Sequence, residues 1–155
     1  MRINPSDFRL LDAKGGPHTV DRFATPYNAQ LLVRFNSKFA SSGCSGVNAL
    51  TQDWSAKNNW LCPPVHLTVD SVRHLKSCSG RGTMIIPKWP SVYFWPFLRE
   101  RSSQFKSFVI DVLVLPVIND LLLEGPGQGQ ICASRPFVFR GCPKFRMLTL
   151  RLDSR

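Results

Sequence analysis

The chain has few acidic residues and no apolar run long enough to cross a membrane. Its 155 residues include 10 Asp and Glu against 20 Lys and Arg. The longest apolar run, VIDVLVLPVI, is interrupted by Asp111 and is too short for a transmembrane helix. The first residues, MRINPSDFRL, lack the apolar core of a signal peptide. We therefore expect an intracellular protein, cytoplasmic or nuclear, that has no membrane partner.

Metal-binding patterns are missing as well. The five cysteines are an odd number without a CxxC pair, and the three histidines do not complete a zinc spacing. The sequence therefore predicts reduced, mostly structural cysteines and no metal site. His66 has no carboxylate at a readable position beside it, so we interpret it as a helix-start residue rather than as a general base. No Cys-His arrangement supports Cys62 as a hydrolase nucleophile.

The residues that are present favour one folded domain that binds polyanions. A content of 43% hydrophobic and 11% aromatic residues argues against disorder, so we expect a single domain over residues 1–155. The net charge of +10 favours nucleic acid as the partner, through counterion release. The alternative is ordinary surface charge on a domain that never meets nucleic acid. The basic residues become denser toward the end, where the candidates for phosphate contact are Arg135, Arg140, Lys144 and Arg146.

The apolar pattern predicts alternating helices and strands. A helix that starts near Pro5, is capped by Asn4 or Ser6, and is ended by Gly15 and Gly16 makes residues 1–17 an N-terminal helix and linker. A strand, a helix and a strand in succession predict a parallel sheet with a right-handed crossover. The strands are expected over residues 18–24, 58–62, 83–87 and 108–115, with a helix over 67–77.

Less regular segments give further predictions. Residues 91–105 are predicted to be a helix despite Pro96, residues 28–35 a short helix or irregular turn, and residues 37–46 a loop. The basic C-terminal region, 125–155, begins in a loop and ends in a strand over 146–152. There Leu148, Leu150 and Leu152 alternate with Met147, Thr149 and Arg151, which is the period of an edge strand with one buried face.

Four landmarks occur in a fixed order between Val20 and Pro90: VDRFATPYNAQ, NALTQDW, NNWLCPPVHL and GTMIIPKWP. Their order resembles that of phage-type DNA N6-adenine methyltransferases, in which a strand ending in an acidic residue precedes an Asn-Ala pair, an acidic loop before a Trp, and Asn-Pro-Pro-Tyr. The narrowest resemblance is to the methyltransferase-like segment downstream of the reverse transcriptase and ribonuclease H in DIRS-type tyrosine-recombinase retrotransposon polyproteins. It extends from about Asn4 to Arg155.

The resemblance implies an α/β fold, namely a Rossmann-like, S-adenosylmethionine-dependent methyltransferase-type sheet with helices on both faces, in an incomplete form. In the related enzymes the cofactor S-adenosylmethionine lies at the carboxyl ends of the strands. By resemblance, Asp21, Phe23 and Ala24 line the cofactor site. Asn48 and Asp53 lie near the adenosine.

The catalytic Asn-Pro-Pro-Tyr motif is replaced here by Cys62-Pro63-Pro64-Val65. In the related enzymes the Asn oxygen and a Pro carbonyl accept hydrogen bonds from the adenine amine, and the Tyr ring stacks on the flipped base. Cys62 offers only a weak thiol, and Val65 has no ring. Asn48 replaces a usual Asp, which weakens the hold on the cofactor. The resemblance, with these departures, implies a degenerate site without methyl transfer.

Three functions stay open. The first is an inactive methyltransferase-like domain that binds DNA or an RNA–DNA intermediate without sequence preference and contacts other domains of a retroelement polyprotein. The second is an active DNA N6-adenine methyltransferase with a divergent motif. The third is a decayed polyprotein fragment without a selected function. Binding of S-adenosylmethionine separates the second function from the other two.

Overall fold

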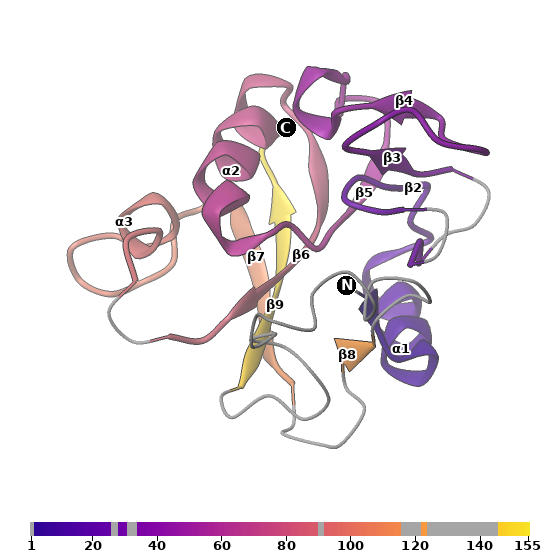
Figure 1. The fold of residues 1–155 in the computed structure, drawn as a ribbon. Coiled ribbons are helices and arrows are strands. Elements are labelled where there is room, and N and C mark those ends of the chain that lie inside the picture. Colours follow the sequence, from indigo (N-terminus) through magenta and orange to yellow (C-terminus); the bar gives the residue numbers. More distant parts are fainter. Residues whose placement is uncertain (1, 26–27, 31–33, 90–91, 116–121, 124–145) are drawn as a thin grey trace, which may run out of the picture.

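A five-stranded mixed sheet with helices on both faces forms the centre of the molecule (Figure 1). The computed structural model describes residues 2–25, 28–30, 34–89, 92–115, 122–123 and 146–155. In spatial order the strands are β2 (Val20–Asp21), β5 (Asn58–Leu61), β6 (Arg81–Pro87), β9 (Met147–Asp153) and β7 (Val109–Val114). The predicted α/β class is therefore confirmed.

The predicted strand–helix–strand unit is present. Strand β5 pairs in parallel with β6, and the connection between them carries a 3-10 turn, η2 (Val65–Leu67), followed by α2 (Thr68–Ser77). Helix α2 buries Val72 and Leu75 against the sheet. It begins soon after Pro63-Pro64 and ends before Gly80, so the proline and glycine signals set its bounds as the sequence predicted.

The last strand, β9, is reversed and lies inside the sheet. It pairs antiparallel with β6 on one side and with β7 on the other. The prediction of an edge strand with one buried face is wrong, because Leu148 and Leu150 pack on the α2 side while Met147 packs on the opposite side. Thr149 is also buried. Among the described strands of this sheet, β7 and β2 are the ones at the ends.

Two short strands extend the sheet beyond β2. Strand β3 (Asn36–Ser37) pairs in parallel with β4 (Gly46–Val47), and a parallel bridge joins Asp21 to Phe35 just before β3. The order across the molecule is therefore β4-β3-β2-β5-β6-β9-β7, and every strand except β9 runs in one direction. After β4 the chain returns to the other side of β2, which makes the gap between β2 and β5 the topological switch point. The described connections between β2 and β4 contain no α-helix.

The two main helices cover opposite faces of the sheet (Figure 1). Helix α1 (Pro5–Gly15) has Asn4 as its cap, the first of the two residues that the sequence offered, and the Asn4 side chain accepts the N–H of Asp7. Its Leu11 packs with Trp60 and other residues of the sheet. The alternation of β5 sends Leu61 to the α2 side and Trp60 to the α1 side.

The segment after β6 differs from its prediction. In place of a helix over 91–105, its described residues contain only α3 (Trp95–Leu98), and a bridge joins Arg99 to Phe105 in a tight turn. Pro96 stands in the first turn of α3, where a proline is tolerated, so the helix cannot begin several residues before it as predicted. The remaining elements are η1 (Ala49–Thr51) and a small pair of strands, β1 (Arg2–Ile3) with β8 (Leu122–Leu123). No helix among the described residues is long and apolar enough to cross a membrane.

Candidate functional site

The switch point brings together two of the four sequence landmarks. Asp21 ends β2 and lies opposite Trp60 of β5 in parallel register. Pro63 is three residues beyond Trp60, so it lies about 10 Å further along at roughly 3.3 Å per residue. Asp21 and the Cys62–Val65 motif therefore meet at the carboxyl edge of neighbouring strands, as predicted. We call residues 21–24 and 62–65 the switch-point site.

The carboxylate of Asp21 is turned into the protein. Its side chain is 3% exposed, and its two oxygens accept the backbone N–H groups of Gln30, at 2.7 Å, and of Phe23, at 3.3 Å. Burial raises the pKa of Asp21 to about 6 despite these two hydrogen bonds. The carboxylate thus holds the segment that follows β2, and its hydrogen-bonding oxygens are engaged within the chain.

Arg22, next to Asp21, is a buried cation that the sequence did not single out. Its Nε donates to Asn59 Oδ1 at 2.7 Å, and its Nη1 donates to Asn36 Oδ1 at 2.8 Å. Its Nη2 donates to the carbonyl of Asp53 at 3.0 Å. Burial lowers the pKa of Arg22 to about 10, which still leaves the side chain charged at neutral pH. One arginine among 20 basic residues carries no sequence signal for such a position.

Phe23 and Ala24 are packing residues in this arrangement. The Phe23 ring meets Trp54 edge-on at 6.3 Å between centroids. Ala24 is buried with Ala29 and Phe35. The turn after Ala24 is closed by Asn28, whose Oδ1 accepts the N–H of Thr25 at 2.6 Å.

The two residues assigned to the adenosine, Asn48 and Asp53, are exposed and make local hydrogen bonds. Asn48, with a φ of 58°, is exposed and caps η1 by accepting the N–H of Leu50. Asp53 is exposed, and its carboxylate accepts the N–H and hydroxyl of Ser55 at 2.9 and 3.0 Å. These hydrogen bonds lower the pKa of Asp53. The hydrogen bond between Asp53 and the switch-point site is made by its backbone carbonyl, which accepts from Arg22.

The Cys62–Val65 motif has its polar groups engaged or buried. Cys62 is 5% exposed among the apolar residues beneath α1, and burial raises the pKa of its thiol to about 12. The carbonyl of Pro64 accepts the N–H of Leu67 at 2.8 Å. The carbonyl of Val65 accepts the hydroxyl of Tyr93 at 2.9 Å. The ring of Tyr93, with 55% of the residue exposed, therefore lies beside the motif, which no sequence signal predicted.

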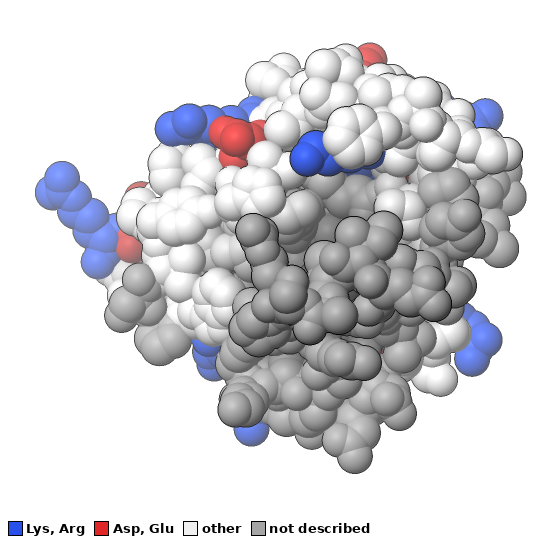
Figure 2. All heavy atoms as spheres, in the orientation of Figure 1, with Lys and Arg blue, Asp and Glu red and all other residues white. Residues whose placement is uncertain are grey.

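Of the four basic residues expected to contact phosphate, Arg146 is the one that lies within the described residues. Arg146 is exposed just before β9, and its carbonyl accepts the N–H of Lys88 at the end of β6. It therefore lies at the same edge of the sheet as the switch-point site. Arg135, Arg140 and Lys144 lie outside the described residues. On the face shown in Figure 2, the Lys and Arg of the described residues are spread among neutral and a few acidic residues and do not gather into one patch.

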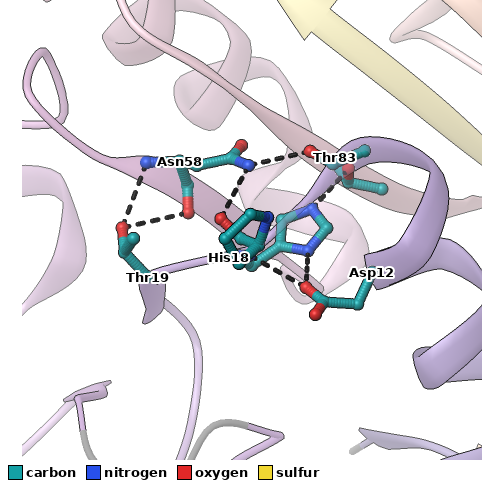
Figure 3. Close-up of polar contacts among 7 residues, drawn as sticks. Asp12, His18, Thr19, Asn58 and Thr83 are labelled. Atoms are coloured by element: carbon teal, nitrogen blue, oxygen red, sulfur yellow. Dashed lines mark hydrogen bonds and ion pairs between the residues drawn. The ribbon is translucent and has the colours of Figure 1, made fainter.

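A second polar cluster lies under α1 (Figure 3). Nδ1 of His18 is 2.6 Å from Asp12 Oδ1, and its Nε2 is 2.7 Å from Thr83 Oγ1. Thr83, His18 and Asp12 are thus connected in the order of a nucleophile, a general base and a carboxylate. However, Thr83 is 2% and His18 6% exposed, so a substrate cannot reach the hydroxyl. Asn58 bonds the carbonyls of Gly15 and of the residue before His18, and the cluster ties α1 to the sheet.

Comparisons of the chain with protein-family models, with curated proteins and with solved structures found no match. Within the described ranges, no group of three His, Cys, Asp or Glu side chains is placed to hold a metal ion. The interpretation of the site therefore rests on its own geometry and on the order of the sequence landmarks.

Proposed function

We propose that this chain is an inactive DNA N6-adenine methyltransferase-like domain, derived from a DIRS-type retrotransposon polyprotein, that binds nucleic acid without sequence preference. One observation carries the proposal: Asp21 and the Cys62–Val65 motif lie on neighbouring parallel strands at the switch point. The mostly parallel sheet, with β9 as its reversed strand beside the edge strand β7, is compatible with the Rossmann-like fold that the resemblance implies.

The chemistry of the motif supports the absence of methyl transfer. The adenine amine needs strong acceptors that raise the charge density on its nitrogen. The Cys62 thiol is a weak acceptor, and with a pKa of about 12 it stays neutral at physiological pH. It is also packed beneath α1, away from solvent. The Pro64 carbonyl is already engaged by Leu67.

The residues assigned to S-adenosylmethionine do not fit that cofactor as they stand. The carboxylate of Asp21 is satisfied by backbone N–H groups, and that of Asp53 by Ser55. Arg22 occupies the space between β2, β3 and β5 with bonds to both neighbouring strands. A cofactor would have to break these contacts, so we expect it to bind weakly or not at all.

Calorimetric titration of the purified protein with S-adenosylmethionine tests the inactive assignment. We expect no saturable heat, and the Asp21→Ala variant should behave identically. Binding with a dissociation constant in the low micromolar range, which is a binding free energy of about −8 kcal/mol, would overturn this expectation if the Asp21→Ala variant no longer binds. Fluorescence anisotropy with labelled duplex and single-stranded DNA tests nucleic-acid binding separately. Absence of binding at low salt would remove that part of the proposal.

Tyr93 favours a second candidate, an active methyltransferase with a divergent motif. Its exposed ring, held by the bond to Val65, stands where an aromatic face could contact a flipped base. Transfer of a labelled methyl group from S-adenosylmethionine to duplex DNA distinguishes the two functions. Activity that Tyr93→Ala abolishes and Tyr93→Phe retains would establish the second candidate.

A further inference from the structure

The loop between β3 and β4, residues 38–45, is held by polar contacts among its own residues and with Ser37, the last residue of β3. The Ser37 hydroxyl donates to the carbonyl of Phe39 and lies 3.1 Å from the Ser41 hydroxyl. The N–H of Cys44 donates to the carbonyl of Ser41 at 3.2 Å. Gly43 has a φ of +77°, which closes the turn at little steric cost. These contacts give the backbone of the loop a defined course.

This ordered loop presents a large apolar ring to solvent. Phe39 is 71% exposed, more than any other exposed large hydrophobic residue in the described part of the chain. The Lys38 ammonium lies 5.3 Å from the centroid of its ring, within cation–π range. Residues that bind ligands are often carried on loops positioned by a rigid scaffold, and Phe39 lies on such a loop directly after β3.

The ring lies at the functional edge of the sheet. Strand β3 runs parallel to β2, so Lys38 and Phe39, which follow it, stand at the same edge as the switch-point site. The N–H of Ala24 donates to the carbonyl of Asn36 at 3.0 Å, which joins the two segments directly. Neighbouring strands are about 4.8 Å apart, so one strand spacing separates them. Figure 1 shows β3 and β4 side by side beyond β2.

We propose that Phe39, with Lys38, is a stacking platform for a base of single-stranded nucleic acid. The proposal rests on the proposed nucleic-acid binding and gives it a strand preference and a site. A phenyl ring can stack on any base whose face is open, which a duplex does not offer. The adjacent ammonium serves the phosphate, and the net charge of +10 attracts a polyanion to the protein as a whole. No base-edge contact is required, so the platform is sequence-tolerant.

The test measures binding of a fluorescently labelled thymidine oligonucleotide and of a duplex, by anisotropy at several salt concentrations. Phe39→Ala should weaken single-strand binding about tenfold with an unchanged salt slope, because stacking releases no counterion. Phe39→Trp should retain the affinity. Lys38→Ala should lower the salt slope on single strands by about 0.7. Duplex affinity should change less than twofold or so in Phe39→Ala.

The matched controls are Leu10→Ala on α1 and Ile110→Ala on β7, since each removes a side chain that is 52% exposed elsewhere. Both should bind like the unsubstituted protein. If Phe39→Ala binds single strands as tightly as the unsubstituted protein does, the proposal of a stacking platform is wrong, but the proposal of nucleic-acid binding stands. An equal loss on duplex and single strand also overturns stacking. If the unsubstituted protein binds neither strand form at low salt, both proposals fail.

Discussion

His18 Nε2 lies 2.7 Å from Thr83 Oγ1, and this contact joins the segment after α1 to the central strand β6. Asp12, whose Oδ1 is 2.6 Å from Nδ1, accepts the Nδ1–H, so Nε2 of the neutral ring accepts the Thr83 hydroxyl. Burial is the main reason that the pKa of His18 is lowered, although Asp12 opposes it and Arg151 and Arg81 add to it. The neutral ring therefore belongs to the folded state.

Stability should fall in acid because of His18. A pKa below the ordinary 6.5 means that the unfolded chain takes up the proton first. The contribution of His18 is therefore complete above pH 6.5 and is lost as pH falls through its folded pKa. His18→Gln should flatten this part of the pH profile and cost about 1–3 kcal/mol at pH 7.5 through unsatisfied partners. Urea unfolding at pH 5 to 8, about ten points, provides the measurement. An unchanged profile would contradict the assignment.

Asp21 should act in the opposite direction. Its pKa is raised from an ordinary 3.8 to about 6, so the folded state holds the proton more tightly than the unfolded chain. Its stabilising effect is complete below pH 3.8 and is lost as pH rises through about 6, an effect of about 3 kcal/mol. Asp21→Asn should remove the decrease between those pH values. Comparing the His18→Gln protein with and without Asp21→Asn isolates the contribution of Asp21. If the free energy of unfolding changes equally with pH in the two proteins, the prediction is refuted.

The central position of β9 can be tested with two truncations. Leu150→Ala should cost about 2–5 kcal/mol of unfolding free energy, because Leu150 is 0% exposed between β6 and β7. Ile110→Ala, on the edge strand β7 and 52% exposed, should cost less than about 1 kcal/mol. Chemical denaturation of both variants measures the two losses of unfolding free energy. Similar costs would contradict a buried β9.

The cysteines should differ in reactivity. The thiol of Cys62 is buried and its pKa is raised to about 12. Cys44 is partly exposed; burial would raise its pKa, but hydrogen bonds led by the one from Ser37 lower it overall. Brief alkylation followed by peptide mass spectrometry should therefore label Cys44 well before Cys62. In urea both should react alike, and fast labelling of native Cys62 would show that its site is open.

Nucleic-acid binding through the C-terminal basic residues is a separate prediction. Replacing Arg140, Lys144 and Arg146 together with Ala should lower the slope of log affinity against log salt by about two to three units on duplex DNA, at roughly 0.9 per phosphate contact. Anisotropy at several salt concentrations measures the slope.

The control for that variant removes the same charge elsewhere. The exposed residues to replace are Lys76, Arg81 and Arg101. Their replacement should leave the slope nearly unchanged, because they lie outside the proposed region. Equal effects of the two triple variants would mean that binding follows total charge rather than a site.

The sequence predicted the fold best where breakers bound apolar runs. Pro63-Pro64 and Gly80 delimit α2, so the unit from β5 to β6 was predicted closely. The alternation of β9 did not reveal its place, because Met147 and Thr149 can be buried as well as exposed. An edge strand and a central strand then share one pattern.

The sequence predicted where the switch-point site lies in the sheet, but not the hydrogen bonds that its side chains make. The order of Asp21 and the Cys62–Val65 motif along the chain was enough to predict neighbouring strand ends. Neither the inward bonds of Arg22 nor the approach of Tyr93 has a local signature, since both depend on residues distant in sequence. His18 likewise has no sequence signal for its contact with Thr83, which lies 65 residues further along the chain.

The position of β9 also governs the order in which the molecule can be completed during synthesis. The ribosome releases β6 and β7 long before Met147, yet in the described sheet these two strands meet only through β9. Until the final strand emerges, β7 is an apolar strand without its sheet partner, open to chaperones or to other nascent chains. A stop codon before residue 147 would therefore leave a gap in the middle of the sheet rather than a shortened edge.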